Sequence, residues 1–580
     1  MASWAKLDAA RGARGSQLIC AFLGLFFGLA VSWPALGQQA MPEAARLDAA
    51  QKAFDSGRWE EAAQLSRGPD TQTADLDFLC GLALARQQRW EESRRAFVAG
   101  HRKAPNDPRF LVELAGVDYK QNNYWSAKRN LRAALRLGSR DAYTLDFLGT
   151  IYFLQGNLEA ALKYWNAVDK PRLRNVNVQP APLVEETLLR RAIAFNAPQI
   201  LSGDSLLASD ARLENLGIFS HERVELKSAS DNFDATLHLA ERNGWGDSKL
   251  EGALALLSGV PYATIYPEIY NLEHRAINFT SLLRWDSEKR RAFGTLSTPL
   301  FDNPSRRLEI YVDARNENWN LGHTFFGGAA PSDLNMRRVA GGVELRSVVN
   351  GRWSWSTGSE IASRSFRNLP AISSIAERKF FTDATSFAYW LRMDRSLLRV
   401  PEHRFTLDSS AEGRIGHTFA ENLGDFGTVR GTLDAHWLPR TSGDDFEMRT
   451  RVRAGATVGA VPFDELFQLG VERDNDLWLR GHAGTSDGRK GSAPLGRRYF
   501  LSNWEMDKNV YGNGIFTVKL GPFLDTGSIA DSSGLFGSQR WLWDTGAQCK
   551  VRVLGSVTVV LIYGRDLRGG HNVYYGTLLH

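Results

Sequence analysis

The residues with the clearest chemical potential are one arginine and two acids in the C-terminal part of the chain. Arg480 precedes Gly481 at the end of an apolar segment, Glu505 follows an Asn-Trp pair, and Asp525 lies in a Phe-Leu-Asp-Thr-Gly segment that ends at Gly527. A guanidinium can bind a carboxylate through two charge-assisted hydrogen bonds. Acids buried in a protein need such a cationic partner. The chemistry that we expect from this group is therefore ion pairing.

The sequence around these residues has the pattern of membrane-spanning β-strands. Residues 515–520, 541–553 and 557–566 alternate or mix apolar and polar side chains. Strands of about ten such residues present one face to lipid and the other to a polar lumen. Because a carboxylate that faces lipid is costly, we expect Glu505 and Asp525 to point into the lumen, where a loop arginine would be their partner.

The order and spacing of these segments resemble the BamA/TamA-like superfamily of outer-membrane assembly and translocation barrels, also called bacterial surface antigens. There an Arg-Gly-aromatic loop tip enters the barrel and packs against acids on the next two strands. The resemblance implies that Arg480 is the loop-tip arginine and that Glu505 and Asp525 are its acids. His482 departs from the pattern, because it stands where the superfamily has Phe or Tyr. The ion pairs would stiffen the folded loop, take part in transport, or do both.

The N-terminal segment is predicted to be a secretion signal that covers residues 1–37. Lys6, Arg11 and Arg14 precede an apolar run over residues 18–31, and Ala-Leu-Gly at residues 35–37 offers a cleavage site. After this run, no stretch of 18 or more apolar residues follows, so we expect no transmembrane helix. A secreted chain with amphipathic strands indicates the outer membrane of a diderm bacterium.

Composition excludes several classes of function. The net charge of +5 is spread along the chain without a basic run, so no nucleic-acid partner is expected. Aromatic residues make up 11% of the chain, with 17 Trp, which suits the interfacial girdles of a barrel. Cys80 and Cys549 lie far apart and have no His or Cys neighbours at ligand spacing, so we expect neither a disulfide nor a metal site. No Ser/His/Asp order or phosphate-binding loop is visible, and we expect no cofactor and no enzyme activity.

Residues 38–173 repeat with a period of 34 residues in an Ala-, Leu- and Arg-rich helical pattern. The repeated positions are small or large residues where paired helices would meet, and they resemble the tetratricopeptide repeat. We expect three repeats preceded by an atypical copy, and hence an α-solenoid. Its role would be a periplasmic docking platform, a spacer or a dimerisation surface. The repeated positions are Gly81, Ala115 and Gly149, then Ala127 and Ala161, then Phe97, Leu131 and Trp165.

Residues 174–243 resemble one POTRA domain, an α/β unit. We expect a linker over residues 175–182, helices over 184–195 and 204–216, and strands over 223–226 and 235–240. The domain would offer a strand edge to an unfolded client or would only connect the repeats to the barrel. If Thr236 or Leu237 lies on that edge, a proline there should reduce client handling. The residues that carry the resemblance are Arg212, Leu213, Gly217, Phe219 and Glu241.

Residues 244–580 are predicted to form an antiparallel transmembrane β-barrel of 16 strands. If the first strand runs outward from the POTRA-like unit, the alternation of strand directions places residues 350–351 and 401–403 at short periplasmic turns. The long connections 320–336, 364–385 and 462–498 then fall outside, and the loop with Arg480 is the sixth outer loop. The expected strand centres are Ala253, Tyr266, Phe279, Gly294, Tyr311, Gly342, Trp355, Tyr389, Leu407, Leu433, Val452, Asn503, Val518, Ala547, Val560 and Tyr575.

The sequence therefore predicts a multidomain outer-membrane protein with its repeats and POTRA-like domain in the periplasm. Its function would be the insertion or translocation of polypeptides, with an unidentified periplasmic or secreted protein as client and with outer-membrane lipid and lipopolysaccharide around the barrel. The alternatives are a passive channel, a structural protein that anchors a partner complex, or a barrel that exports lipid or polysaccharide. The Arg480 loop favours the first function, because simple porins lack it.

Overall fold

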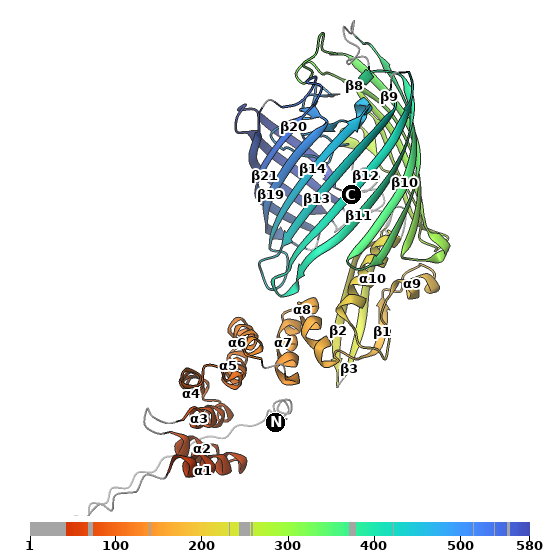
Figure 1. Cartoon of the computed structure of the whole chain (residues 1–580). Helices are drawn as coiled ribbons and strands as arrows, with labels where there is room; N and C mark the ends of the chain where they lie inside the picture. Colours follow the sequence, from red (N-terminus) through yellow and green to blue (C-terminus); the bar gives the residue numbers. More distant parts are fainter. Residues whose placement is uncertain are drawn as a thin grey trace, which may run out of the picture. The chain divides into compact units, whose positions relative to one another are not determined.

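The computed structural model describes residues 42–67, 73–138, 141–230, 232–242, 256, 259–369, 379–421, 423–513, 515–538, 540–553 and 557–579 (Figure 1). The expected signal peptide and the expected strand centre at Ala253 lie outside these residues. The chain divides into two compact units, residues 1–104 and 105–580. Among the described helices, none has the length and apolar character needed to cross a membrane.

The described part of the first unit contains helices that follow one another along the chain. α1 packs against α2, and α3 packs against α4. Ala53, Ala62 and Ala83 are buried between them, and their small side chains allow the helices to approach closely. The helices are α1 (Glu43–Asp55), α2 (Trp59–Ser66), α3 (Ala74–Arg86) and α4 (Trp90–Lys103).

The second unit begins with two more helix pairs, in which side-chain caps fix the helix starts. Asp107, Asn123, Asp141 and Asn157 each accept a hydrogen bond from a backbone N–H in the first turn of the following helix. Asp118 is fully buried and accepts a hydrogen bond of 2.8 Å from the amide of Asn130. The helices are α5 (Pro108–Lys120), α6 (Tyr124–Arg136), α7 (Ala142–Leu154) and α8 (Leu158–Trp165).

The small residues of the 34-residue period lie where two helices of a pair meet. A β-carbon on Gly81 would lie 2.5 Å from the ring of Phe97, and one on Gly149 would lie 2.4 Å from the indole of Trp165. Any larger residue would therefore separate the helices. The other small positions of the repeat are fully buried, and these are Ala115, Ala127 and Ala161.

An α/β domain follows, with a three-stranded sheet in the order β1-β3-β2. β1 runs parallel to β3, and β2 runs antiparallel to it. Ser202 and Ser205 form a reciprocal cap at the start of α10, and Gly217 ends this helix with a positive φ of 70°. The elements are β1 (Leu173–Gln179), α9 (Glu186–Ala192), α10 (Gly203–Leu216), β2 (Phe219–Ala229) and β3 (Asn232–Glu241).

Three expectations for this domain were wrong. Residues 175–179 are not a linker, because they belong to strand β1 and pair with β3. The first helix is shorter than expected and ends at Ala192, before residues 193–195. Thr236 and Leu237 lie on β3, the central strand, so they form no free edge, and a proline there would remove hydrogen bonds inside the sheet. The free edges are β1 and β2.

The residues that carry the POTRA resemblance lie in the domain core and at its contact with the barrel. Leu213 and Phe219 are buried in the domain core. A β-carbon on Gly217 would lie 2.3 Å from Nη1 of Arg307, a barrel residue. Nη1 of Arg212 donates to the carbonyl of Arg191 at 3.3 Å, and Glu241 accepts a hydrogen bond of 2.8 Å from the backbone of residue 183.

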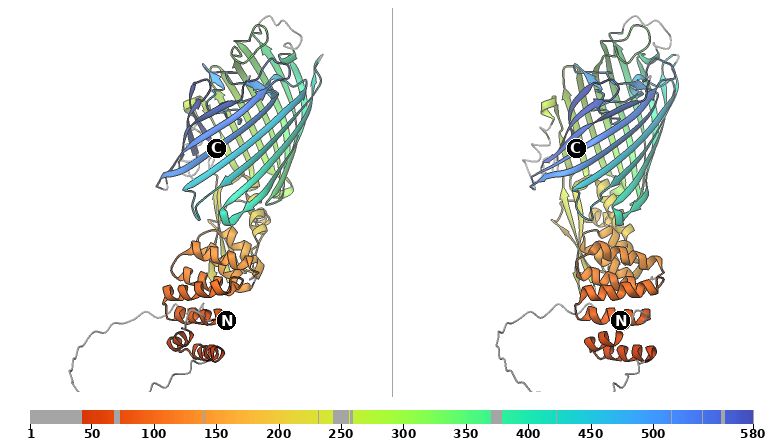
Figure 2. Two further views of the ribbon diagram at one scale, coloured as in Figure 1. Left: turned by 60° about the vertical axis from the view of Figure 1, so that its left-hand side comes forward. Right: turned by 90° about the vertical axis from the view of Figure 1, so that its left-hand side faces the viewer.

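A large antiparallel sheet follows and curves into a barrel (Figure 2). Its strand order closes on itself with β23 next to β4. Fourteen of the sixteen expected strand centres lie in strands, and Tyr266 lies between β4 and β5. The long strands are β6 (Ile277–Trp285), β7 (Lys289–Pro299), β8 (Arg306–Trp319), β9 (Leu334–Asn350), β10 (Trp353–Arg367), β11 (Ala384–Val400), β12 (Phe405–Phe419), β13 (Asp425–Trp437), β14 (Phe446–Gly459), β19 (Arg498–Gly512), β20 (Phe516–Ala530), β21 (Leu542–Val553), β22 (Val557–Asp566) and β23 (Asn572–Leu579), and β4 (Thr264–Ile265) and β5 (Glu268–Leu272) precede them.

Exposed apolar side chains alternate with buried side chains along the strands. On β11, Phe387, Tyr389 and Leu391 are 40–45% exposed, whereas Ala388 and Trp390 between them are buried. This period of two is the pattern of a barrel with an apolar outer surface.

The two ends of the barrel differ in their connections. The turn at Gly351 lies against Leu207 of α10, and the carbonyl of Pro401 accepts a hydrogen bond of 2.8 Å from Asn157 of α8. Both turns, expected at the periplasmic end, thus lie at the end that contacts the α/β domain and the last helix pair. The long connections between β8 and β9, β10 and β11, and β14 and β19 lie at the opposite end.

Candidate functional site

The connection between β14 and β19, residues 460–497, folds into the barrel, and we call it the inward loop. Two short strands, β15 (Phe467–Gln468) and β18 (Leu495–Gly496), pair across its base. Leu469, Leu477 and Leu479 of the loop are buried against Leu501 and Ile529 of the wall. Three clusters of charged residues join the loop to the wall.

The first cluster is centred on Arg480 at the tip of the inward loop. Nη2 of Arg480 lies 2.6 Å from Oδ1 of Asp525, and Nε lies 2.8 Å from Oδ2. Nη1 lies 3.0 Å from Oε2 of Glu505 and 2.8 Å from Oε1 of Gln548. The guanidinium therefore contacts both acids at once, with a two-point contact to Asp525. These are the contacts that the sequence analysis expected.

Neighbouring residues donate further hydrogen bonds to the two acids, and an aromatic ring stacks on the arginine. Asp525 is fully buried and also accepts a hydrogen bond of 2.7 Å from Asn503. Glu505 has a second cation, because Nζ of Lys550 lies 3.2 Å from its Oε1. The guanidinium carbon of Arg480 lies 3.9 Å from the centre of the Phe523 ring.

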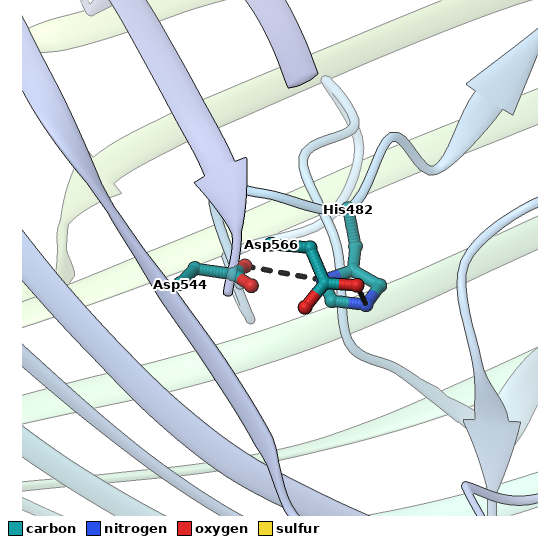
Figure 3. A group of neighbouring side chains, drawn as sticks. All are labelled: His482, Asp544 and Asp566. Atoms are coloured by element: carbon teal, nitrogen blue, oxygen red, sulfur yellow. Dashed lines mark hydrogen bonds and ion pairs between the residues drawn. The ribbon is translucent and has the colours of Figure 1, made fainter. Parts of the chain in front are cut away.

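Three acids lie directly opposite one another on neighbouring strands beside the tip. Asp525 of β20 pairs in register with Asp544 of β21, which pairs with Asp566 of β22. The backbone N–H of Gly481 donates to Oδ2 of Asp544. Nδ1 of His482 lies 3.1 Å from the same oxygen, and Nε2 lies 3.7 Å from Oδ2 of Asp566 (Figure 3). Residues 480–482 thus lie across three strands and contact one acid after another.

Glycines allow this close approach at the loop tip. A β-carbon on Gly481 would lie 2.6 Å from Cγ of Asp544, and one on Gly564 would lie 1.9 Å from the carbonyl oxygen of Arg480. At Gly527 it would lie 2.9 Å from the carbonyl of Phe500 in the neighbouring strand. Gly481 and Gly564 therefore admit the loop backbone to the barrel wall.

The sequence analysis found no metal ligands at suitable spacing, but the fold gathers three. His482, Asp544 and Asp566 each place one ligand atom within 4.8 Å of the others. The two ring nitrogens face different carboxylates, so one ion could bind one nitrogen and both acids only after the imidazole rotates. In the arrangement that the structure gives, the imidazole is an ion-pair partner of the two acids.

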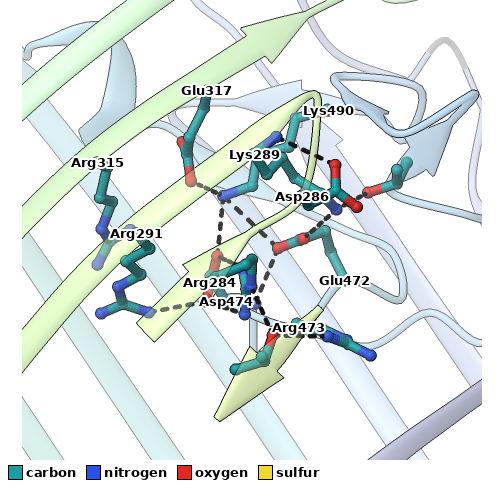
Figure 4. A network of polar contacts seen from close by, with 12 residues as sticks. Arg284, Asp286, Lys289, Arg291, Arg315, Glu317, Glu472, Arg473, Asp474 and Lys490 are labelled. Atoms are coloured by element: carbon teal, nitrogen blue, oxygen red, sulfur yellow. Dashed lines mark hydrogen bonds and ion pairs between the residues drawn. The ribbon is translucent and has the colours of Figure 1, made fainter. Parts of the chain in front are cut away.

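In the second cluster, two acids of the loop face cations of the wall (Figure 4). One pair has the reverse order, because Lys490 of the loop lies 2.7 Å from Glu317 of β8. Asp474 lies 2.8 Å from Arg284 of β6, 2.7 Å from Arg291 of β7 and 3.4 Å from Lys490 of the loop. Glu472 lies 3.2 Å from Lys289. Both acids are buried, so their charges are balanced by these partners alone among the described residues.

The third cluster fixes the beginning of the inward loop. Asp464 pairs with Arg364 of β10 and lies 3.0 Å from Nε of Arg338 of β9. Glu465 lies 3.1 Å from Arg414 of β12. Glu360 on β10 lies 2.8 Å from Arg338 and 2.7 Å from Arg414, and so balances the remaining positive charge.

Sequence reasoning identified the Arg480 group but missed the other charged residues of the loop. Glu472 and Asp474 lie in a polar stretch that reads as solvent-exposed. Asp544 and Asp566 lie far from His482 in sequence. The one available signal was His482 itself, because its departure from an aromatic residue indicates a polar partner nearby. Together the clusters hold a chain segment rigidly inside the lumen, and they supply no nucleophile next to a general base.

No protein-family model matches this sequence, and no curated protein matches it. Among solved structures, BamA from Haemophilus ducreyi lacking POTRA domains 1-3 is similar at 13% identity and a TM-score of 0.43, over 70% of this chain and 85% of that one. CdiB from Escherichia coli is similar at 13% identity and a TM-score of 0.45, over 71% and 75%. The MamA RS-1 ArsTM double mutant matches 22% of this chain and 75% of its own, at 12% identity and a TM-score of 0.21. The structural neighbours of this chain thus include BamA and CdiB.

Proposed function

We propose that this chain is an outer-membrane β-barrel protein that inserts or translocates polypeptides. In this proposal the barrel has 16 strands, and the inward loop is its sixth outer loop. The POTRA-like α/β domain and the tetratricopeptide-like helix pairs lie in the periplasm, where they receive a client protein. Outer-membrane lipid and lipopolysaccharide surround the barrel. The protein is not an enzyme and needs no cofactor.

The observation that carries this proposal is the buried pairing of Arg480 with Asp525 and Glu505. A long loop joined to the barrel wall by three ionic clusters narrows the lumen and so restricts free diffusion of solutes through it. A loop whose position depends on ion pairs can instead take discrete positions, which a device that admits a chain and then closes would need.

Crosslinking from one strand tests the proposal. A photoreactive amino acid at Thr432, which lines a lumen cavity, should capture a client polypeptide in growing cells. The matched position is Leu433 on the same strand, which is 45% exposed on the outer surface and should capture lipid. A passive channel or an anchoring protein would give no polypeptide adduct at Thr432, and a polysaccharide exporter would give a glycan adduct there.

A further inference from the structure

The lumen between the loop tip and the α/β domain contains a cavity rich in arginine, which we call the arginine cavity. Its volume is about 610 Å³, and nine arginines and six carboxylates line it. A second cavity of about 330 Å³ shares Arg449, Arg451 and Arg453 with the first and reaches Arg480 at the loop tip. The cationic space therefore continues to the tip.

Three of these arginines form a stripe along one strand. Arg449, Arg451 and Arg453 are alternate residues of β14 and line the same cavity. Alternate residues of a strand lie about 6.6–6.8 Å apart and point to the same side. The spacing of their guanidinium groups is thus set by the strand.

The stripe has more cations than its own acids balance. Asp434 on β13 lies 2.6 Å from Arg449 and 2.8 Å from Arg451, so one carboxylate serves two guanidinium groups. Arg453 is buried, donates to Asn503 at 2.7 Å and to the carbonyl of Asp476, and lies 3.5 Å from the Asp476 carboxylate. The three arginines of the stripe therefore share two acids. The side chains of Arg449 and Arg451 are 42% and 34% exposed, so they remain accessible to a ligand.

We propose that the arginine cavity binds an acidic, extended polypeptide segment whose alternate carboxylates pair with Arg449 and Arg451. This inference rests on the proposed function and names the chemistry of the client that the barrel receives. Alternate side chains of an extended peptide have the same spacing as alternate residues of β14. Each guanidinium can bind a carboxylate through two hydrogen bonds. Hydroxyls of Ser354, Ser410 and Thr432 also line the cavity and can bind the peptide backbone.

Binding of defined peptides to the full-length protein in detergent micelles tests this inference. The probe is a fluorescent peptide of alternating Glu and Ser, and its binding is followed by anisotropy. The comparison peptides are alternating Lys and Ser, and a peptide of the same Glu and Ser content with all Glu in one block. We expect the alternating Glu peptide to bind most tightly and to weaken as salt is added, because salt screens exposed charges.

Two sets of variants shift the affinity in opposite directions. R449Q/R451Q should weaken binding of the alternating Glu peptide by about tenfold or more, because hydrogen bonds to charged groups are lost. D434N should tighten it by roughly threefold, because the internal carboxylate no longer competes for the guanidinium groups. A folding defect would not tighten binding. R440Q/R498Q removes two arginines that do not line the cavity and should leave the affinity unchanged.

If R449Q/R451Q folds poorly because Asp434 loses its partners, R449Q/R451Q/D434N removes the whole group and should bind as weakly. Equal affinity for the Glu and Lys peptides, or for the alternating and block peptides, would overturn the inference. So would an acidic polysaccharide that binds as tightly as the alternating peptide. These results would leave the proposed function standing as long as Thr432 still captures a polypeptide in cells.

Discussion

The two halves of the inward loop are held by opposite arrangements of charge. At the tip, the guanidinium of Arg480 and the imidazole of His482 contact acids on β19–β22. In the segment just before the tip, Glu472 and Asp474 bring acids to cations on β6 and β7. If the two segments of the loop exchanged their positions in the barrel, like charges would face each other. The loop therefore has one electrostatically favourable position.

The two walls that the loop joins lie on either side of the junction between β23 and β4. The tip binds strands that come just before this junction in the strand order, and the acids of the segment just before the tip bind strands that come just after it. Separation of β23 from β4 would therefore require one of the two clusters to break. The loop therefore connects the strands on both sides of this junction.

The largest effect is expected at Asp474, which three cations share. D474A would leave Arg284, Arg291 and Lys490 without their common partner, and breaking such a buried group costs about 3–5 kcal/mol. We expect the loss of unfolding free energy to lie at the top of this range. The measurement is the urea concentration at which half of the folded band disappears from unheated gels, which should fall in the variant. D302A is the control, because this acid is 43% exposed and should change the midpoint little.

A smaller loss is expected for R480A. Asp525 would keep Asn503 and the backbone N–H of residue 480, and Glu505 would keep Lys550 and Gln548. The cost should therefore lie lower within the range of about 3–5 kcal/mol. Loosening of the loop should also expose residues 487–490 to protease. If R480A resists protease as well as the unsubstituted protein does, the contacts of Arg480 do not hold residues 487–490 in place. That result would contradict the role given to the tip in the comparison.

His482 should matter less than Arg480. H482F replaces the imidazole by an aromatic ring and leaves Asp544 with the N–H of Gly481, while Asp566 keeps two backbone donors. Losing one partner of a buried polar group costs about 1–3 kcal/mol, and we expect the lower end. The loss should shrink in a D544N background. A stabilising effect of H482F would show that aromatic packing outweighs the ion contact.

The last effect is confined to the α/β domain and concerns pH. Burial raises the pKa of Asp210 to about 6, and burial with the nearby carboxylates of Asp210 and Glu214 raises the pKa of Glu222 to about 8. Acids whose pKa is raised in the folded state stabilise it below their unfolded pKa, and this stability is lost as pH rises through the folded values. Hydrogen exchange in α10 and β2, corrected for intrinsic rates, should therefore be slower at pH 5 than at pH 8. D210N/E222Q should remove most of this difference.

Short-range patterns explain what the sequence predicted well. Alternation on β11 and the repeated small residues at Gly81 and Gly149 are local signals of a strand and of a helix pair. The Arg480 group was predictable because each of its residues lies in a recognisable segment. The bounds of β1 are poorly marked in the sequence because its partner β3 lies more than fifty residues later, and a polar edge strand resembles a linker. The cation cluster around Asp474 was missed because only the closed barrel brings β6 and β7 to the loop.

The coupling between Arg480 and Asp525 tests the central claim most directly. The urea midpoints of R480A, D525N and R480A/D525N give a double-mutant cycle for the two residues. The account predicts that the double variant loses less stability than the sum of the single losses, with a coupling of about 2 kcal/mol. Losses that add to within about 0.5 kcal/mol would contradict it, because they would show that the two residues stabilise the protein independently.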